Sequence, residues 1–194
     1  IARAEILFNR KHFDQALTDY KQLKAKATTT ERRQLAATGM LRSAAMMQDD
    51  VETIAAATDM LAEAKLTPEL RNEALYFRAK AYLNQQADKK AMNDLQALAK
   101  DTRTLYGAEA KYLVALQLYK AHEYAAAEKE ILNFIEQSTP HAYWLARSFI
   151  LLSDVYVSMD KKLDARQYLL SLQQNYHADD DIEQMINERL EKLK

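Results

Sequence analysis

The chain has 194 residues, 48% of them apolar, so it is long enough to bury a continuous core. It contains no cysteine, which excludes disulfides, zinc–thiolate sites and cysteine nucleophiles. Its formal net charge of −1, from 27 basic and 28 acidic residues, lacks the basic excess of most nucleic-acid binders.

Glycine and proline are scarce, with two of each in the whole chain. Average usage would give roughly 14 glycines and 10 prolines at this length. Because sheets and irregular loops need these residues in their turns, the composition predicts an all-α protein with tight connections between helices.

Five helix–turn–helix units follow one another along the sequence, at roughly 1–30, 31–67, 68–105, 106–140 and 141–177. In the second helix of each unit one marker position recurs every 36 to 38 residues. The residues at this marker are Ala16, Ile54, Ala91, Ala127 and Ala165. Seven residues after each marker, on the same helical face, lies an apolar residue. These residues are Leu23, Leu61, Leu98, Phe134 and Leu172.

The first helices of the units carry a second recurring feature, a small residue at a common position. Ala79, Ala115 and Ser153 occupy it in the last three units, and a small side chain there lets two helices approach closely. The opening segment, IARAEILFNR, is expected to be the end of a helix in an array that continues upstream. Each unit has an apolar face too large to bury alone, and stacking of neighbours would bury it.

The last segment, 179–194, is predicted to be one further helix that covers the apolar edge of the fifth unit. Asp179, Asp180 and Asp181 stand at its start and basic residues at its end, which matches the helix dipole.

These spacings resemble the tetratricopeptide repeat (TPR) family, whose pattern has small and aromatic residues where repeat four has Ala115, Tyr124, Ala127 and then Pro140. The resemblance implies a right-handed α-solenoid of about five repeats plus a C-terminal capping helix, forming a single domain over 1–194. The chain departs from the family pattern in its period, which exceeds 34 residues, and in Ile54 at a small-residue position. The long units look similar to TPR proteins of bacterial cell envelopes, which implies a periplasmic or envelope location, with the cytoplasm as the alternative.

The segment AHEYAAAEKE, residues 121–130, contains a pattern that suggests metal chemistry. The Asp triplet 179–181 could also bind a cation, but it lacks the spacing and the glycine of a calcium loop and is interpreted as a helix N-cap. A zinc protease helix needs His-Glu-x-x-His, and Ala126 occupies the place of the second His after His122 and Glu123. The alignment also places this pair in a turn. No catalytic constellation, phosphate loop or cofactor motif occurs elsewhere, so the chain is predicted to be neither an enzyme nor a cofactor protein.

The family resemblance implies that the first helices line a concave groove that binds a protein or peptide. The groove residues carried over in this way are Tyr76, Lys80, Leu83, Glu109, Tyr112, Leu116, Tyr119, Lys120, Arg147 and Asp154, with Val157 and Ser158 beside them. Each tyrosine has an alternative interpretation as packing between helices. The family's carboxylate clamp is not reproduced, because Tyr76 and Tyr112 occupy the positions of its lysines.

Three functions are consistent with this groove. The first is a non-catalytic protein-interaction scaffold, and the second is a structural spacer or a module that self-associates through its N-terminal edge. The third, RNA binding, is disfavoured by the net charge and by acidic groove positions. The most apolar segment, Phe149–Leu152, is far too short to insert into a membrane.

Overall fold

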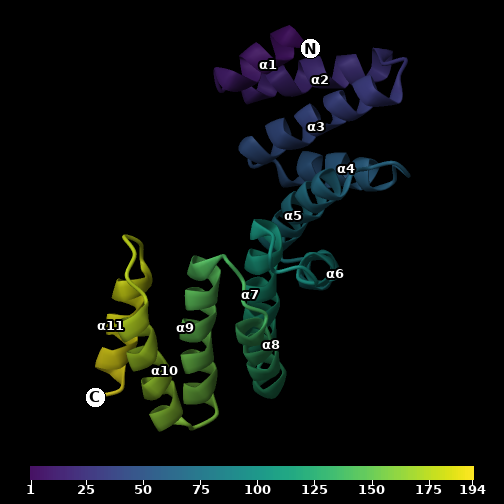
Figure 1. The fold of residues 1–194 in the computed structure, drawn as a ribbon. Helices are drawn as coiled ribbons and strands as arrows, with labels where there is room; N and C mark the ends of the chain where they lie inside the picture. Colours follow the sequence, from purple (N-terminus) through teal and green to yellow (C-terminus); the bar gives the residue numbers. More distant parts are fainter. The chain divides into compact units, whose positions relative to one another are not determined.

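The computed structural model describes all 194 residues. It contains eleven α-helices and no β-strand, which confirms the all-α class. The helices are shown in Figure 1. Their bounds are α1 Ala2–Asn9, α2 Phe13–Lys26, α3 Thr30–Met46, α4 Asp50–Leu61, α5 Pro68–Asn84, α6 Asp88–Leu98, α7 Leu105–Lys120, α8 Tyr124–Glu136, α9 Ala142–Ser158, α10 Lys162–Asn175 and α11 Ile182–Lys192. None of them combines the length and the apolar character that a bilayer-spanning helix needs.

The chain divides into two compact units, unit 1 (Ile1–Asp94) and unit 2 (Leu95–Lys194). In unit 1, α2 packs against α1 and α3, and α4 packs against α3 and α5. In unit 2, α9 lies against α7, α8, α10 and α11. The expectation that residues 1–194 form a single solenoid domain stays a prediction.

Threonine side chains begin several of the first helices. Thr29, Thr67 and Thr104 are the N-caps of α3, α5 and α7, and each hydroxyl accepts a hydrogen bond from a backbone N–H three residues later. Such a cap satisfies one of the N–H groups that a helix start leaves without a partner. The boundaries expected from sequence, near residues 30, 67 and 105, therefore coincide with capped helix starts.

The turn inside each helix pair repeats with the same backbone geometry. One residue in each turn has a positive φ, between 56° and 65°, although none of the five is glycine. These residues are Lys11, Gln48, Gln86, His122 and Asp160. In every case the N–H of the following residue donates to the carbonyl oxygen five residues back, which closes a Schellman turn. The five helix pairs are therefore repeats in backbone structure as well as in sequence pattern.

This turn corrects the alignment of repeat two. Counting five residues on from each positive-φ residue reaches Ala16, Ala91, Ala127 and Ala165 in four repeats, but Thr53 in repeat two, where Ile54 was expected. Thr53 is 3% exposed and donates its hydroxyl hydrogen to the Asp49 carbonyl oxygen. The marker is thus a small buried residue in all five repeats, and the apparent exception came from aligning on side-chain type without the turn.

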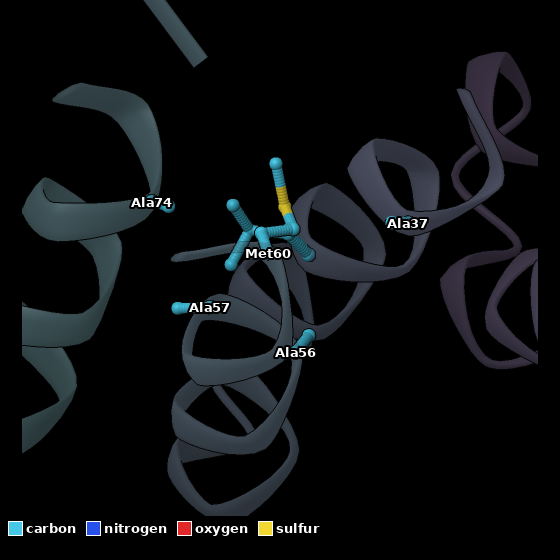
Figure 2. Close-up of a cluster of buried hydrophobic side chains, with 6 residues drawn as sticks. Ala37, Ala56, Ala57, Met60 and Ala74 are labelled. Carbon is cyan, nitrogen blue, oxygen red and sulfur yellow. The ribbon is translucent and has the colours of Figure 1, made fainter. Parts of the chain in front are cut away.

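The interior of unit 1 is built mainly from small side chains, as Figure 2 shows. Met60 of α4 lies between Ala37 of α3 and Ala74 of α5 and is 2% exposed. Alanines on the flanking helices let the backbones approach, and the flexible Met side chain fills the remaining space.

The expected C-terminal helix forms as α11 and contributes to the core of unit 2. Ile182 and Ile186 pack with Ala146, Ile150 and Leu169, and each of these five residues is at most 2% exposed. The acidic start of α11 differs in detail from a simple cap, because Asp181 accepts a hydrogen bond from the Tyr143 hydroxyl.

Candidate functional site

A hollow of about 560 Å³ opens on unit 2, and several residues of the expected groove line it. Three first-helix elements, α7, α9 and α11, and the neighbouring α10 contribute to it. Its lining residues are Tyr119, Ser153, Asp154, Val157, Ser158, Lys162, Leu169, Glu188, Arg189, Lys192 and Leu193. This set is called the unit 2 hollow below. Its volume lies within the range of about 300 to 1,000 Å³ that is usual for ligand pockets.

An ion pair across the hollow holds α11 beside α9. Arg189 Nε and Nη2 donate to the two carboxylate oxygens of Asp154 at 2.8 and 3.0 Å. Burial lowers the pKa of Arg189, but the hydrogen bond and the charge of Asp154 raise it by more, so the net shift is upward. Both side chains are about one quarter exposed, 26% for Asp154 and 25% for Arg189. The pair therefore forms a partly buried, oriented wall of the hollow.

Four of the residues expected in the groove meet in this hollow: Tyr119, Asp154, Val157 and Ser158. Val157 is 40% exposed, so part of its apolar side chain is accessible to a ligand. The Tyr119 ring lies 5.7 Å from that of Tyr124 and is half-buried. The structure thus brings together an aromatic ring, an accessible valine and a charged pair from positions that the sequence placed on one groove.

Tyr112 and Arg147 lie in a different arrangement, inside an aromatic cluster. The Arg147 guanidinium lies 5.0 Å from the centre of the Tyr112 ring, and its Nη2 donates to the Tyr112 hydroxyl at 3.1 Å. Its Nη1 donates to the Tyr143 hydroxyl at 2.9 Å, and Trp144 lies 5.9 Å away. Burial lowers the pKa of Arg147, yet the hydrogen bonds to the tyrosines give a net upward shift.

The exposure of these residues changes their expected roles. Tyr112 is 6% exposed, so it offers little surface to a ligand, and its hydroxyl accepts a hydrogen bond from Arg147. Glu109, at 7% exposure, is also too deeply buried for the direct ligand contact expected of it. The packing interpretation therefore holds for Tyr112. Leu116 is half-buried and Lys120, the last residue of α7, is exposed.

The groove residues expected on α5 belong to unit 1. Tyr76, Lys80 and Leu83 are all half-buried. The Lys80 ammonium lies 5.8 Å from the centre of the Tyr76 ring, in the geometry of a cation–π contact.

Unit 1 has a hollow of its own, of about 530 Å³, that the sequence interpretation did not include. Residues of α1 and α3 provide most of its lining, together with Tyr20 and Leu70. On its wall Arg42 Nε and Nη2 donate to the carboxylate of Glu73 at 2.6 and 3.0 Å. The groove residues expected from the sequence begin at the third repeat. The same first-helix positions in repeats one and two were the available signal.

Sequence reasoning also missed the contribution of α11 to the unit 2 hollow. It treated this helix as a cover for the apolar edge, whereas Glu188, Arg189, Lys192 and Leu193 line the hollow. The repeat spacing was the signal that was present. Asp154 lies 35 residues after Tyr119 and 35 before Arg189, so α11 continues the series of first helices.

The His-Glu pair of residues 122 and 123 lies where the alignment placed it, in the turn between α7 and α8. His122 has a φ of 61°, and its Nδ1 lies 2.7 Å from the Tyr124 hydroxyl. No group of three or more His, Cys, Asp or Glu side chains gathers in an arrangement that would hold a metal ion.

Comparison with known proteins adds no family to this description. No family model matches the chain, and no curated protein shows significant sequence similarity to it. The resemblance to TPR proteins therefore stays a prediction that depends on the repeat pattern of this chain alone.

Proposed function

We propose that the chain is a non-catalytic protein-interaction scaffold that binds a peptide segment or partner domain on the first-helix face of unit 2. The observation that carries this proposal is the unit 2 hollow, which gathers Tyr119, Asp154, Val157 and Ser158 on that face. Exposed apolar surface beside oriented charges is typical of surfaces that recognise peptides.

The composition of the hollow favours a peptide over a small metabolite. It is open to one side of three first helices, and its polar groups come from four separate helices. An extended or helical segment that lies across these helices would place successive side chains along the wall. Tyr119 contributes contact area at a small entropic cost, because its side chain has few rotatable bonds.

A right-handed solenoid of TPR-like repeats is the architecture that we propose for this scaffold. The support is the recurrence of the positive-φ turn at residues 11, 48, 86, 122 and 160, with a small buried residue five positions later. Repeats of this kind present their first helices on a common face.

Self-association or a spacer role is the alternative, and exposed apolar side chains in unit 1 favour it. Ile6 of α1 is 51% exposed and Leu35 of α3 is 54% exposed. Burial of such side chains against a second copy would stabilise the pair by about 25 cal/mol for each Å² of apolar surface removed from water.

The test is affinity capture from the lysate of source cells with a variant that fills the hollow. Ser158 is exposed and lies on the lining, so Ser158→Trp blocks access while leaving the core intact. Gln167→Trp is the matched control, because Gln167 is exposed on α10 and does not line the hollow. Partners lost with Ser158→Trp and kept with Gln167→Trp would support the proposal. Partners kept by both variants would place the site elsewhere.

No specific partner, together with a mass that rises with concentration in light scattering, would instead support self-association. Leu35→Asp should then abolish the rise in mass, because it places a charge at the exposed apolar site on α3.

A further inference from the structure

We infer that the occupant of the unit 2 hollow is an acidic peptide segment that carries an apolar side chain between its carboxylates. This inference deepens the proposed function and rests on it. It depends on three features: the two lysines of the hollow that have no carboxylate partner, the position of Arg147 further along α9, and the apolar surface of the hollow.

The charges of the hollow do not cancel. Three cations line it, Lys162, Arg189 and Lys192, with two carboxylates, Asp154 and Glu188. Arg189 and Asp154 neutralise each other in their bidentate pair. The ammonium groups of Lys162 and Lys192 lie in no ion pair with the chain's own carboxylates.

The remaining carboxylate, Glu188, has a local hydrogen-bond partner and forms no ion pair with either lysine. Glu188 Oε1 accepts a hydrogen bond from Gln184 Nε2 at 3.0 Å, one turn earlier on α11. The carboxylates of a partner could therefore pair with both ammonium groups without breaking an ion pair inside the chain. Such complementarity favours an anionic ligand.

Arg147 extends this cationic surface along α9. It lies seven residues before Asp154, two helical turns away on the same side of the helix. The distance along the helix axis is about 10 Å, the length of three or four residues of extended peptide. Its guanidinium contacts only tyrosine hydroxyls and aromatic rings, whereas Arg78 holds the two carboxylate oxygens of Asp94.

The geometry of Arg147 leaves donors free for a ligand. Nη1 and Nη2 each donate one hydrogen bond to a tyrosine, and each of these nitrogens carries two hydrogens. The rings of Tyr112 and Tyr143 orient the guanidinium without neutralising its charge. A charged group that is partly buried without a carboxylate partner is favourable only if rings, water or a ligand compensate it.

The surface between these cations is apolar. Val157 is 40% exposed, and Leu193 and Tyr119 line the hollow beside it. An apolar ligand side chain placed here would be flanked by Lys162 and Lys192. This arrangement matches a carboxylate, an apolar residue and a second carboxylate in sequence.

The experiment measures the binding of labelled 12-residue peptides to the full chain by fluorescence anisotropy. The probe contains two Glu-Leu-Glu triplets separated and flanked by Gly-Ser. Its counterparts carry Gln or Lys in place of each Glu, and a 12-nucleotide oligouridine represents RNA. We expect the Glu peptide to bind about tenfold tighter than the Gln peptide at low salt, because a tenfold ratio needs only about 1.4 kcal/mol.

Charge variants show whether binding occurs in the hollow. Lys162→Glu/Lys192→Glu is expected to weaken Glu-peptide binding at least about tenfold. Lys100→Glu/Lys129→Glu is the matched control, because it changes the net charge equally at exposed lysines of unit 2 outside the hollow. Arg147→Lys, which keeps the charge but loses the planar guanidinium, is expected to weaken binding several-fold.

Each other outcome would overturn the inference. Equal losses in the two double variants would mean nonspecific attraction by net charge, and tighter binding of oligouridine would mean a nucleic-acid site. If no peptide binds but the parent chain still captures partners that Ser158→Trp does not, the inference of an acidic ligand is wrong and the proposed scaffold function is retained. If the capture fails as well, the proposed function fails with it.

Discussion

Asp154 and Arg189 lie 35 residues apart and form the bidentate ion pair that joins α9 to α11. The spacing is close to one repeat, so the two residues occupy neighbouring first helices. Their pairing makes α11 a wall of the unit 2 hollow as well as a cover for the core.

Removing either partner of this pair is expected to destabilise unit 2. Asp154→Ala and Arg189→Ala should each lower the free energy of unfolding by about 1 kcal/mol, because the pair is only partly exposed and has two parallel hydrogen bonds. Urea denaturation of the single and double variants gives the coupling energy, for which we expect roughly 1 kcal/mol. Additive losses would mean that the pair itself contributes nothing.

At the positive-φ turn positions, glycine is expected to make the protein more stable than the native residue does. Gln86 has a φ of 60°, which costs a residue with a Cβ about 1 to 2 kcal/mol relative to glycine. Glycine's greater freedom in the unfolded chain offsets part of this, so Gln86→Gly should raise the stability by about 0.5 to 1 kcal/mol. Gln85→Gly is the control. Its φ is −86°, so it should lower the stability instead.

Gly39 is a position where helix propensity and packing oppose each other. Alanine would favour the helix by about 1 kcal/mol. However, a Cβ at Gly39 would overlap ring carbons of Tyr20, and such overpacking costs about 1 to 3 kcal/mol. We expect Gly39→Ala to lower the thermal midpoint of unfolding.

The Gly39→Ala loss should disappear when Tyr20→Ala is already present, because the ring that the Cβ would meet is gone. A loss that persists in this background would exclude the Tyr20 clash as its cause. Gly107 provides a contrast. A Cβ there would overlap the backbone carbonyl oxygen of Asp101, so no side-chain change should rescue Gly107→Ala.

Ser43 is a buried hydroxyl with no hydrogen-bond partner, and it is 0% exposed. Replacing it with alanine removes an unsatisfied polar group, so Ser43→Ala should stabilise the protein by about 1 kcal/mol. Ser148 is equally buried, but its hydroxyl donates to the Trp144 carbonyl oxygen at 2.8 Å. Ser148→Ala should therefore gain less in the same denaturation experiment, and equal gains would show that only helix propensity changed.

The raised pKa of Tyr176 predicts a loss of stability at alkaline pH. Burial, reinforced by the hydrogen bond that its hydroxyl donates to Asp180, raises the pKa of Tyr176 to about 12. Because the pKa is raised above the ordinary value of 10.0, the stabilisation is complete below pH 10 and is lost as the pH rises towards 12.

Urea denaturation at several pH values between 8 and 12 tests this sign. Tyr176→Phe should be less stable than the parent below pH 10, and the difference should shrink through the window from 10 to 12. Parallel pH profiles of the two proteins would show that this tyrosine is not linked to folding. The buried Tyr156, whose pKa is also raised, should remain as a background common to both.

Much of the helical arrangement was predictable because it depends on local patterns. The period of 36 to 38 residues, the threonine caps and the small residue that follows each turn all lie within short stretches of sequence. The single error of register, Ile54 in place of Thr53, arose because the apolar residue Ile54 was matched to the marker instead of the adjacent small residue Thr53. A backbone dihedral decided between them, and side-chain type does not reveal it.

The sequence by itself determined the all-α class, the five helix pairs and their turns, since hydrophobic periodicity and capping act over one or two helical turns. Only the tertiary structure decided which first-helix side chains are accessible. Tyr112 and Tyr119 lie seven residues apart on one side of α7, yet Trp144 and Arg147 cover the first while the second lines a hollow. That difference depends on which side chains of α9 lie opposite each tyrosine. Arg147, 35 residues after Tyr112, contacts its ring, whereas Asp154, 35 residues after Tyr119, lines the hollow with it.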